Sequence, residues 1–267
     1  MDVVRLSEQL LTARARSRRL VPLTASVPDF TVEAAYHVAA EVLRTRLRAG
    51  ERPVGRKIGF TNRTIWDEYG VHGPIWSHMY DSTVRFARDD QGRQSLKGAM
   101  EPRIEPEIAF KFKNTPPAGA TAEQLVEAIE WVAHAYEIVV SPFPKWKFKA
   151  ADTIAAFGLH GTLIVGTPMP MRELVNPAVL LASFKVKLSC DGVERASGGG
   201  ANVLGSPMQA ISYLQSTLRS QPQFAPLRAG EIVTTGTLTA ALPIKAGQRW
   251  STQFTGLPLP GLRIAFE

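Results

Sequence analysis

Two glutamates separated by one residue, Glu105 and Glu107, have the spacing in this sequence that most clearly suggests chemistry. They lie in the segment Arg103–Phe112, where apolar residues recur with the period of two that is typical of a β-strand. Both carboxylates then point to one face, roughly 7 Å apart along the strand, where they could bind one hard cation such as Mg²⁺ or Mn²⁺. The alternative is a half-exposed strand with an acidic outer face, so the metal site requires a third ligand.

A third glutamate, Glu137, lies in the next segment with strand character, Ala135–Val140. This segment follows a helix that we expect to be capped by Thr121 and to carry apolar residues as far as Val132. Glu137 precedes three consecutive apolar residues, and a carboxylate in such surroundings is rarely just a solvated charge. We expect it to complete the metal site, and a core or edge glutamate with other partners is the alternative.

Two other residues with useful chemistry, Lys57 and His160, each lie close to glycines on both sides. Glycine lets the backbone pass close to a ligand, so these positions suit residues that line a site. Lys57 would supply positive charge and His160 would serve as an acid or base. The alternatives are a solvated lysine and a structural loop histidine.

The composition predicts a folded globular chain of 267 residues, 45% hydrophobic and 21% charged. The net charge of +7 is spread along the chain without a nucleic-acid-binding motif, so we expect a small anionic substrate and no nucleic-acid partner. The single cysteine, Cys190, excludes an internal disulfide framework and favours a cytoplasmic protein. No apolar run approaches the roughly 20 residues that span a bilayer, and the basic cluster Arg14–Arg19 is expected on an exposed helix face.

The pattern along the chain predicts an α+β fold. We expect helices at Val4–Arg19 and Val32–Ala49, an aromatic loop at Val71–Asp81, and mainly strands in the C-terminal third that alternate like a rolled sheet. No repeat or flexible linker divides the sequence. We therefore treat residues 1–267 as one domain, with residues 1–50 as its helical N-terminal part.

Several motifs together resemble the fumarylacetoacetate hydrolase superfamily, and within it the branch of 2-keto-4-pentenoate hydratases and 4-oxalocrotonate decarboxylases. The resemblance runs from near residue 28 to the C-terminus, and its most specific segments are Pro28–Thr31, Gly55–Thr61, Gly70–Val71, Ile104–Phe110, Tyr136–Val139, Val203–Pro207 and Ala229–Thr237. It implies a rolled mixed β-sheet with peripheral helices.

The resemblance also implies roles for individual residues. The three metal-binding carboxylates of the family match the glutamates above, and the cation is expected to be Mg²⁺ or Mn²⁺. The family's catalytic lysine matches Lys57, and the acid that closes its aromatic loop matches Asp81. We expect Asp81 or His160 to transfer protons. Thr237, at the end of the last matching motif, is expected at the substrate.

One segment departs from the family. The hydratases usually have Asp-Thr-x-Ala-Asp-Asn-Ala-Ser, where this chain has Ala156, Phe157 and Leu159 in place of the second Asp, the Asn and the Ser, followed by His160. We expect Phe157 and Leu159 to contact the substrate and to make the site more apolar, which would favour a bulkier 2-oxo acid.

The function that these observations favour is a metal-dependent hydratase that adds water to a 2-oxo-enoate of aromatic catabolism through a metal-stabilised enolate. A 2-oxo-3-enedioate decarboxylase and an acylpyruvate hydrolase share that enolate and are alternatives. A fourth possibility is an inactive, metal-free partner subunit. A homo-oligomer is expected, which could associate with a related pathway enzyme.

Overall fold

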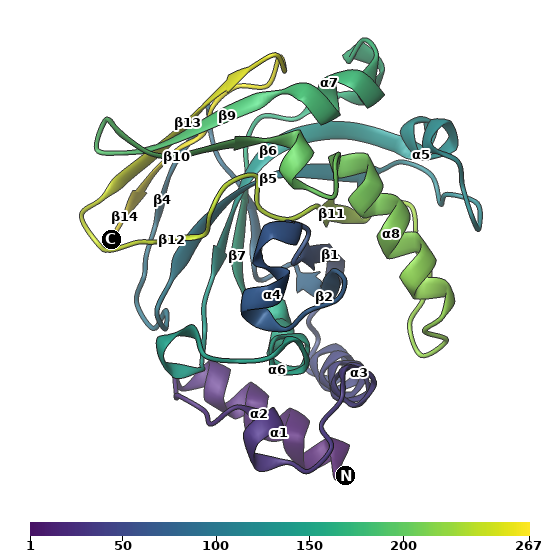
Figure 1. Ribbon diagram of the computed structural model, residues 1–267, viewed down its shortest axis with the longest axis vertical. Coiled ribbons are helices and arrows are strands. Elements are labelled where there is room, and N and C mark those ends of the chain that lie inside the picture. Colours follow the sequence, from purple (N-terminus) through teal and green to yellow (C-terminus); the bar gives the residue numbers. More distant parts are fainter.

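The computed structural model describes the backbone of residues 1–267 and all side chains except those of Ile65 and Glu68. Its centre is a curled mixed sheet (Figure 1). The strand order is β2-β1-β11-β5-β6-β7-β3, with β12 beside β5 and β8 beside β6. The strands of this sheet are β1 (Pro53–Gly59), β2 (Ile75–Tyr80), β3 (Val84–Phe86), β5 (Arg103–Phe112), β6 (Ile129–Val139), β7 (His160–Val165), β8 (Met169–Pro170), β11 (Ile232–Thr234) and β12 (Leu242–Pro243). The expected rolled mixed sheet is confirmed.

A second sheet of five strands has the order β10-β9-β13-β14-β4. Its strands are β4 (Gln91–Gln94), β9 (Lys185–Cys190), β10 (Val193–Gly199), β13 (Arg249–Thr255) and β14 (Arg263–Phe266). Apolar side chains of this sheet form one core with Ile104, Tyr136 and Ile138 of β5 and β6. Because neighbouring residues of a strand face opposite sides, Glu105 and Glu137 point away from this core.

The α-helices lie beside the two sheets. They are α1 (Val3–Ala15), α2 (Leu23–Ser26), α3 (Val32–Arg48), α4 (Trp66–Tyr69), α5 (Ala122–Ala128), α6 (Ala150–Ala155), α7 (Pro177–Ser183) and α8 (Pro207–Arg219). The N-terminal helices α1 to α3 form a layer at one end of the molecule, next to α6 (Figure 1). Thr31 caps α3 by accepting a hydrogen bond from the backbone N–H of Ala34. No helix among the described residues is long and apolar enough to cross a membrane.

Three expected boundaries were wrong. The first helix ends at Ala15, before Arg19, because the chain turns at Ser17 with a positive φ of 49°. Residues 75–80, expected in a loop, form β2, which pairs antiparallel with β1. The helix after Thr121 ends at Ala128, and β6 begins at once, because residues 129–132 pair with the end of β5. Apolar residues at these positions suit a helix face and a doubly covered strand alike.

Candidate active site

The three glutamates meet on adjacent antiparallel strands. Glu105 of β5 and Glu137 of β6 are directly opposite each other in the register, and Glu107 lies two residues further along β5 on the same face. One carboxylate oxygen from each residue lies within 4.8 Å of the other two. Glu107 and Glu137 are completely buried, and the half-buried Glu105 lines a cavity. The glutamates therefore do not form a merely solvated acidic face of the strand.

The protein supplies too few positive charges and hydrogen bonds to offset the burial of negative charge in this carboxylate cluster. Burial, together with the charge of Glu137, raises the pKa of Glu105 to about 7 and that of Glu107 well above the usual range of a glutamate. Glu107 Oε2 accepts a hydrogen bond of 2.9 Å from Gly236 N, but its Oε1 has no hydrogen-bond partner among the described residues. An all-oxygen donor set with an orphaned buried oxygen fits a hard divalent cation.

Lys57 is the cation that the structure places beside this cluster. It extends from β1, and its Nζ lies 3.1 Å from Glu137 Oε2. Burial by itself would lower the pKa of Lys57, but the negative charges of the three glutamates outweigh burial and raise it. The lysine is therefore protonated, and the structure excludes the solvated lysine considered above.

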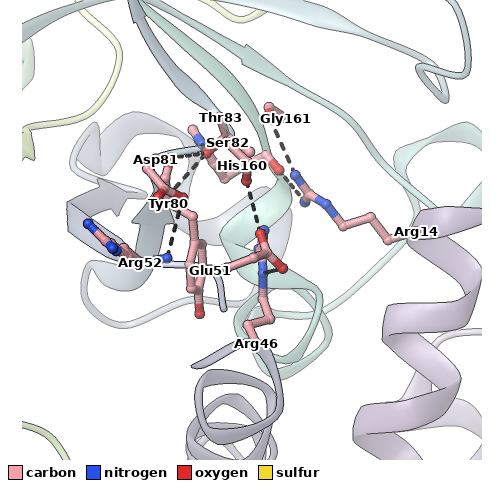
Figure 2. Close-up of polar contacts among 10 residues, drawn as sticks. All are labelled: Arg14, Arg46, Glu51, Arg52, Tyr80, Asp81, Ser82, Thr83, His160 and Gly161. Atoms are coloured by element: carbon pink, nitrogen blue, oxygen red, sulfur yellow. Dashed lines mark hydrogen bonds and ion pairs between the residues drawn. The ribbon is translucent and has the colours of Figure 1, made fainter. Parts of the chain in front are cut away.

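His160 lies behind the cluster, completely enclosed. Its Nδ1 is 2.7 Å from Glu137 Oε1. Its Nε2 is 2.9 Å from Thr83 Oγ1, which lies beside it in Figure 2. Burial lowers the pKa of His160, which favours a neutral ring that donates from Nδ1 to the carboxylate and accepts from Thr83 at Nε2. His160 is not among the side chains that line the cavity described below. Its contacts suit a residue that orients Glu137 rather than one that exchanges protons with substrate.

A cavity of about 620 Å³, a volume that includes space open to solvent, lies beside Lys57 and Glu105. Its wall includes the expected residues Leu159 and Thr237, and also Phe60, Tyr69, Arg103, Trp146 and Phe148. The rings of Tyr69 and Phe148 are stacked with centroids 5.3 Å apart, and the Arg103 guanidinium lies 4.0 Å from the centroid of Trp146. Sequence reasoning missed this aromatic wall, although the tryptophan and phenylalanine in Pro142–Lys149 were a signal for it.

Two residues expected at the site lie elsewhere. Phe157 is buried in the core that includes the N-terminal helices, with its ring centroid 4.9 Å from the Arg14 guanidinium. Residues 157–159 all have positive φ, and this turn directs Leu159 toward the cavity but Phe157 away from it. Asp81 is exposed at the turn after β2, where its Oδ1 accepts a hydrogen bond of 3.3 Å from Arg52 N (Figure 2). These positions do not support substrate contact by Phe157 or proton transfer by Asp81.

The comparisons with known proteins agree with this architecture. The pattern of the Fumarylacetoacetate (FAA) hydrolase C-terminal family matches residues 80–259. A 2-hydroxyhexa-2,4-dienoate hydratase of Comamonas testosteroni is 36% identical, over 94% of this chain and 92% of the relative. A 2-hydroxypent-2,4-dienoate hydratase of Pseudomonas putida is 32% identical, over 80% of this chain and 94% of the relative. The structure of 4-oxalocrotonate decarboxylase from Pseudomonas putida G7, complexed with magnesium and adipate, matches with a TM-score of 0.89 at 25% identity, over 99% of this chain and 97% of that one.

Proposed function

Because the chain belongs to the fumarylacetoacetate hydrolase family, we propose that it is a divalent-metal-dependent lyase that hydrates a 2-hydroxy-2,4-dienoate, the enol form of a 2-oxo-enoate. The observation that carries the proposal is the cluster of three glutamates, two of them completely buried and Glu105 at the cavity, with a protonated lysine beside them. The similarity to dienoate hydratases supports hydration as the reaction.

Each part of the site has a task in this reaction. Glu105, Glu107 and Glu137 would hold one cation, Mg²⁺ or Mn²⁺. When bound, the cation supplies positive charge that stabilises the enolate of a 2-oxo acid. Lys57 places a second positive charge next to the same point, where the substrate carboxylate or enolate oxygen develops negative charge. The aromatic wall and Leu159 exclude bulk water and surround the apolar chain of the substrate.

A second candidate function is decarboxylation of a 2-oxo-3-enedioate. The specific observation in its favour is Arg103, whose guanidinium stacks on Trp146 in the cavity wall and offers a site for a second substrate carboxylate. The overall similarity to a 4-oxalocrotonate decarboxylase supports it too. Both reactions use the same metal-binding glutamates and differ in what leaves or enters at the far end of the substrate.

The experiment is a substrate comparison with controlled metal content. Protein freed of metal with EDTA is assayed with Mg²⁺ or Mn²⁺ on 2-hydroxypenta-2,4-dienoate, 2-hydroxyhexa-2,4-dienoate and 2-oxo-3-hexenedioate. Loss of dienol absorbance and release of carbon dioxide are followed separately. Metal-dependent loss of the dienol without carbon dioxide supports the hydratase. Carbon dioxide from the enedioate alone would establish the decarboxylase instead, and absence of turnover with either metal would favour the inactive partner subunit.

The assembly is part of the proposal as well. We propose a homo-oligomer that could associate with a related pathway enzyme, and light scattering of the purified protein measures the first of these.

A further inference from the structure

Arg14 of the N-terminal helix α1 contacts a backbone segment next to the candidate active site. It lies outside residues 80–259, which match the family pattern, and it was expected on an exposed helix face. Its Nη1 instead donates a hydrogen bond of 2.6 Å to the backbone oxygen of His160, and its Nη2 donates one of 3.4 Å to that of Gly161 (Figure 2). Burial lowers the pKa of Arg14 to about 10, so the group stays charged at neutral pH.

The segment that Arg14 contacts has an unusual backbone. Phe157, Gly158 and Leu159 have φ values of 62°, 60° and 60°. The left-handed region is unfavourable for phenylalanine and leucine, and such a conformation persists only where the surroundings over-determine it. Arg14 contacts this turn on two sides, since it lies over the ring of Phe157 and binds the two carbonyls that follow Leu159.

This turn also positions two groups next to the three glutamates, namely the imidazole of His160 and the side chain of Lys57. His160, whose carbonyl binds Arg14, holds Glu137 through its imidazole. Gly158 packs so closely on Lys57 that a Cβ at this position would lie 3.0 Å from Lys57 Cδ. A shift of the turn would therefore move the partner of a metal-binding carboxylate and the wall next to the lysine together.

We propose that Arg14 is a positioning residue of the active site, which acts through the backbone of residues 160–161 to hold His160 against Glu137. This inference rests on the proposed function in one respect, namely that Glu137 binds the cation. The guanidinium matters for its geometry, because two N–H donors and a flat face contact three parts of one turn.

The test compares Arg14→Met, which keeps much of the apolar stem, with Arg14→Lys and with the control Arg16→Met. Arg16 is exposed at the end of the same helix. Three quantities are measured: the Kd for Mn²⁺ by calorimetry, kcat and KM on the best substrate, and the downfield proton resonance of His160 Nδ1–H, assigned by its loss in His160→Gln. We expect Arg14→Met to weaken Mn²⁺ binding roughly 10-fold or more, the range found when partners of metal ligands are removed. It should also lower kcat and shift the resonance.

Arg14→Lys has a single ammonium group, so its Mn²⁺ affinity, kcat and His160 resonance should lie between those of Arg14→Met and the wild type. Arg16→Met should match the wild type in all three. An Arg14→Met protein with a lower melting temperature but unchanged Mn²⁺ affinity, kcat and His160 resonance would overturn the inference, because that result describes a purely structural residue. If Arg14→Met does not fold, Arg14→Lys decides, and wild-type values in that variant reject the inference. If the wild type binds no Mn²⁺, the proposed metal centre fails, and the His160 resonance alone decides the role of Arg14.

Discussion

Two neighbouring regions of this site are built in different ways. The three glutamates lie on β5 and β6, two strands joined by a continuous antiparallel ladder from Arg103 to Lys111. Residues 157–159 instead form a left-handed turn. Arg14 contacts this turn and binds the backbone oxygen of His160, which is 146 positions away in the sequence. The ladder determines which side chains share a face, whereas the turn depends on contacts with a separate layer of helices.

We infer that the β5–β6 ladder supplies the charged groups of the site, whereas the turn orients them. Substitutions in the ladder should remove charge from a fold that stays intact, because backbone hydrogen bonds hold the strands. Substitutions in and around the turn should leave the glutamates in place and change how well they are oriented or what the cavity accepts.

Replacement of two ladder glutamates should abolish metal binding and activity. The variant Glu105→Gln, Glu107→Gln keeps the shape of both side chains but removes two negative ligands. We expect a loss of turnover of at least about 10³-fold, since a bound metal supplies several kcal/mol of charge stabilisation. Removal of buried like charges need not destabilise the metal-free fold. Elemental analysis, kinetics and the melting temperature measure these effects, and Glu130→Gln, at an exposed position of β6, is the control.

Full metal occupancy in that double variant would show that Glu105 and Glu107 do not bind the cation. The division between metal-binding strands and an orienting turn would then be wrong.

Lys57→Met should lower kcat about 10²-fold or more, the scale expected for an electrostatic or proton-transfer group. The physical reason is the loss of a buried positive charge that lies 3.1 Å from Glu137 Oε2. Lys111→Met, which removes a more exposed lysine from β5, is the matched control. Wild-type kinetics in Lys57→Met, on a demonstrated substrate, would show that the lysine takes no part in the reaction.

His160→Gln should weaken metal binding roughly 10-fold or more, because it breaks the hydrogen bond that orients Glu137. The effect should be smaller than that of the double glutamate variant, since all three carboxylates remain. Calorimetric titration with Mn²⁺ measures it, with His37→Gln on the exposed face of α3 as the control. An unchanged Kd would mean that the ladder orients Glu137 without help from the turn.

The smallest effect is expected from Leu159→Ser, which places a hydroxyl in the cavity wall. It should raise kcat/KM for 2-hydroxypenta-2,4-dienoate relative to the hexadienoate by up to about 10-fold, because an apolar wall discriminates mainly by size. Phe157→Asn should leave that ratio unchanged and lower the melting temperature, since Phe157 packs in the core. A change of selectivity in Phe157→Asn alone would place its side chain at the substrate after all.

Much of the candidate site could be predicted from residue types and spacing. The alternation in Arg103–Phe112 predicted a strand, and the strand period placed Glu105 and Glu107 on one face; both expectations are confirmed. Glu137 and Lys57 were expected nearby from their motifs, and the structure brings them together. Local periodicity determines such relationships because a strand has a single repeat of side-chain directions. Whether the four residues bind metal and substrate as proposed stays a prediction, as does the single domain.

Other features were decided only by the tertiary structure. The direction of Phe157, the exposure of Asp81 and the partial burial of Arg14 differ from what the sequence suggested. Each depends on which distant surface packs against a turn, and a turn has no period from which side-chain directions follow. Residues 75–80 form a strand for a related reason. They pair with the edge of β1, and a local sequence pattern does not show that this edge is available.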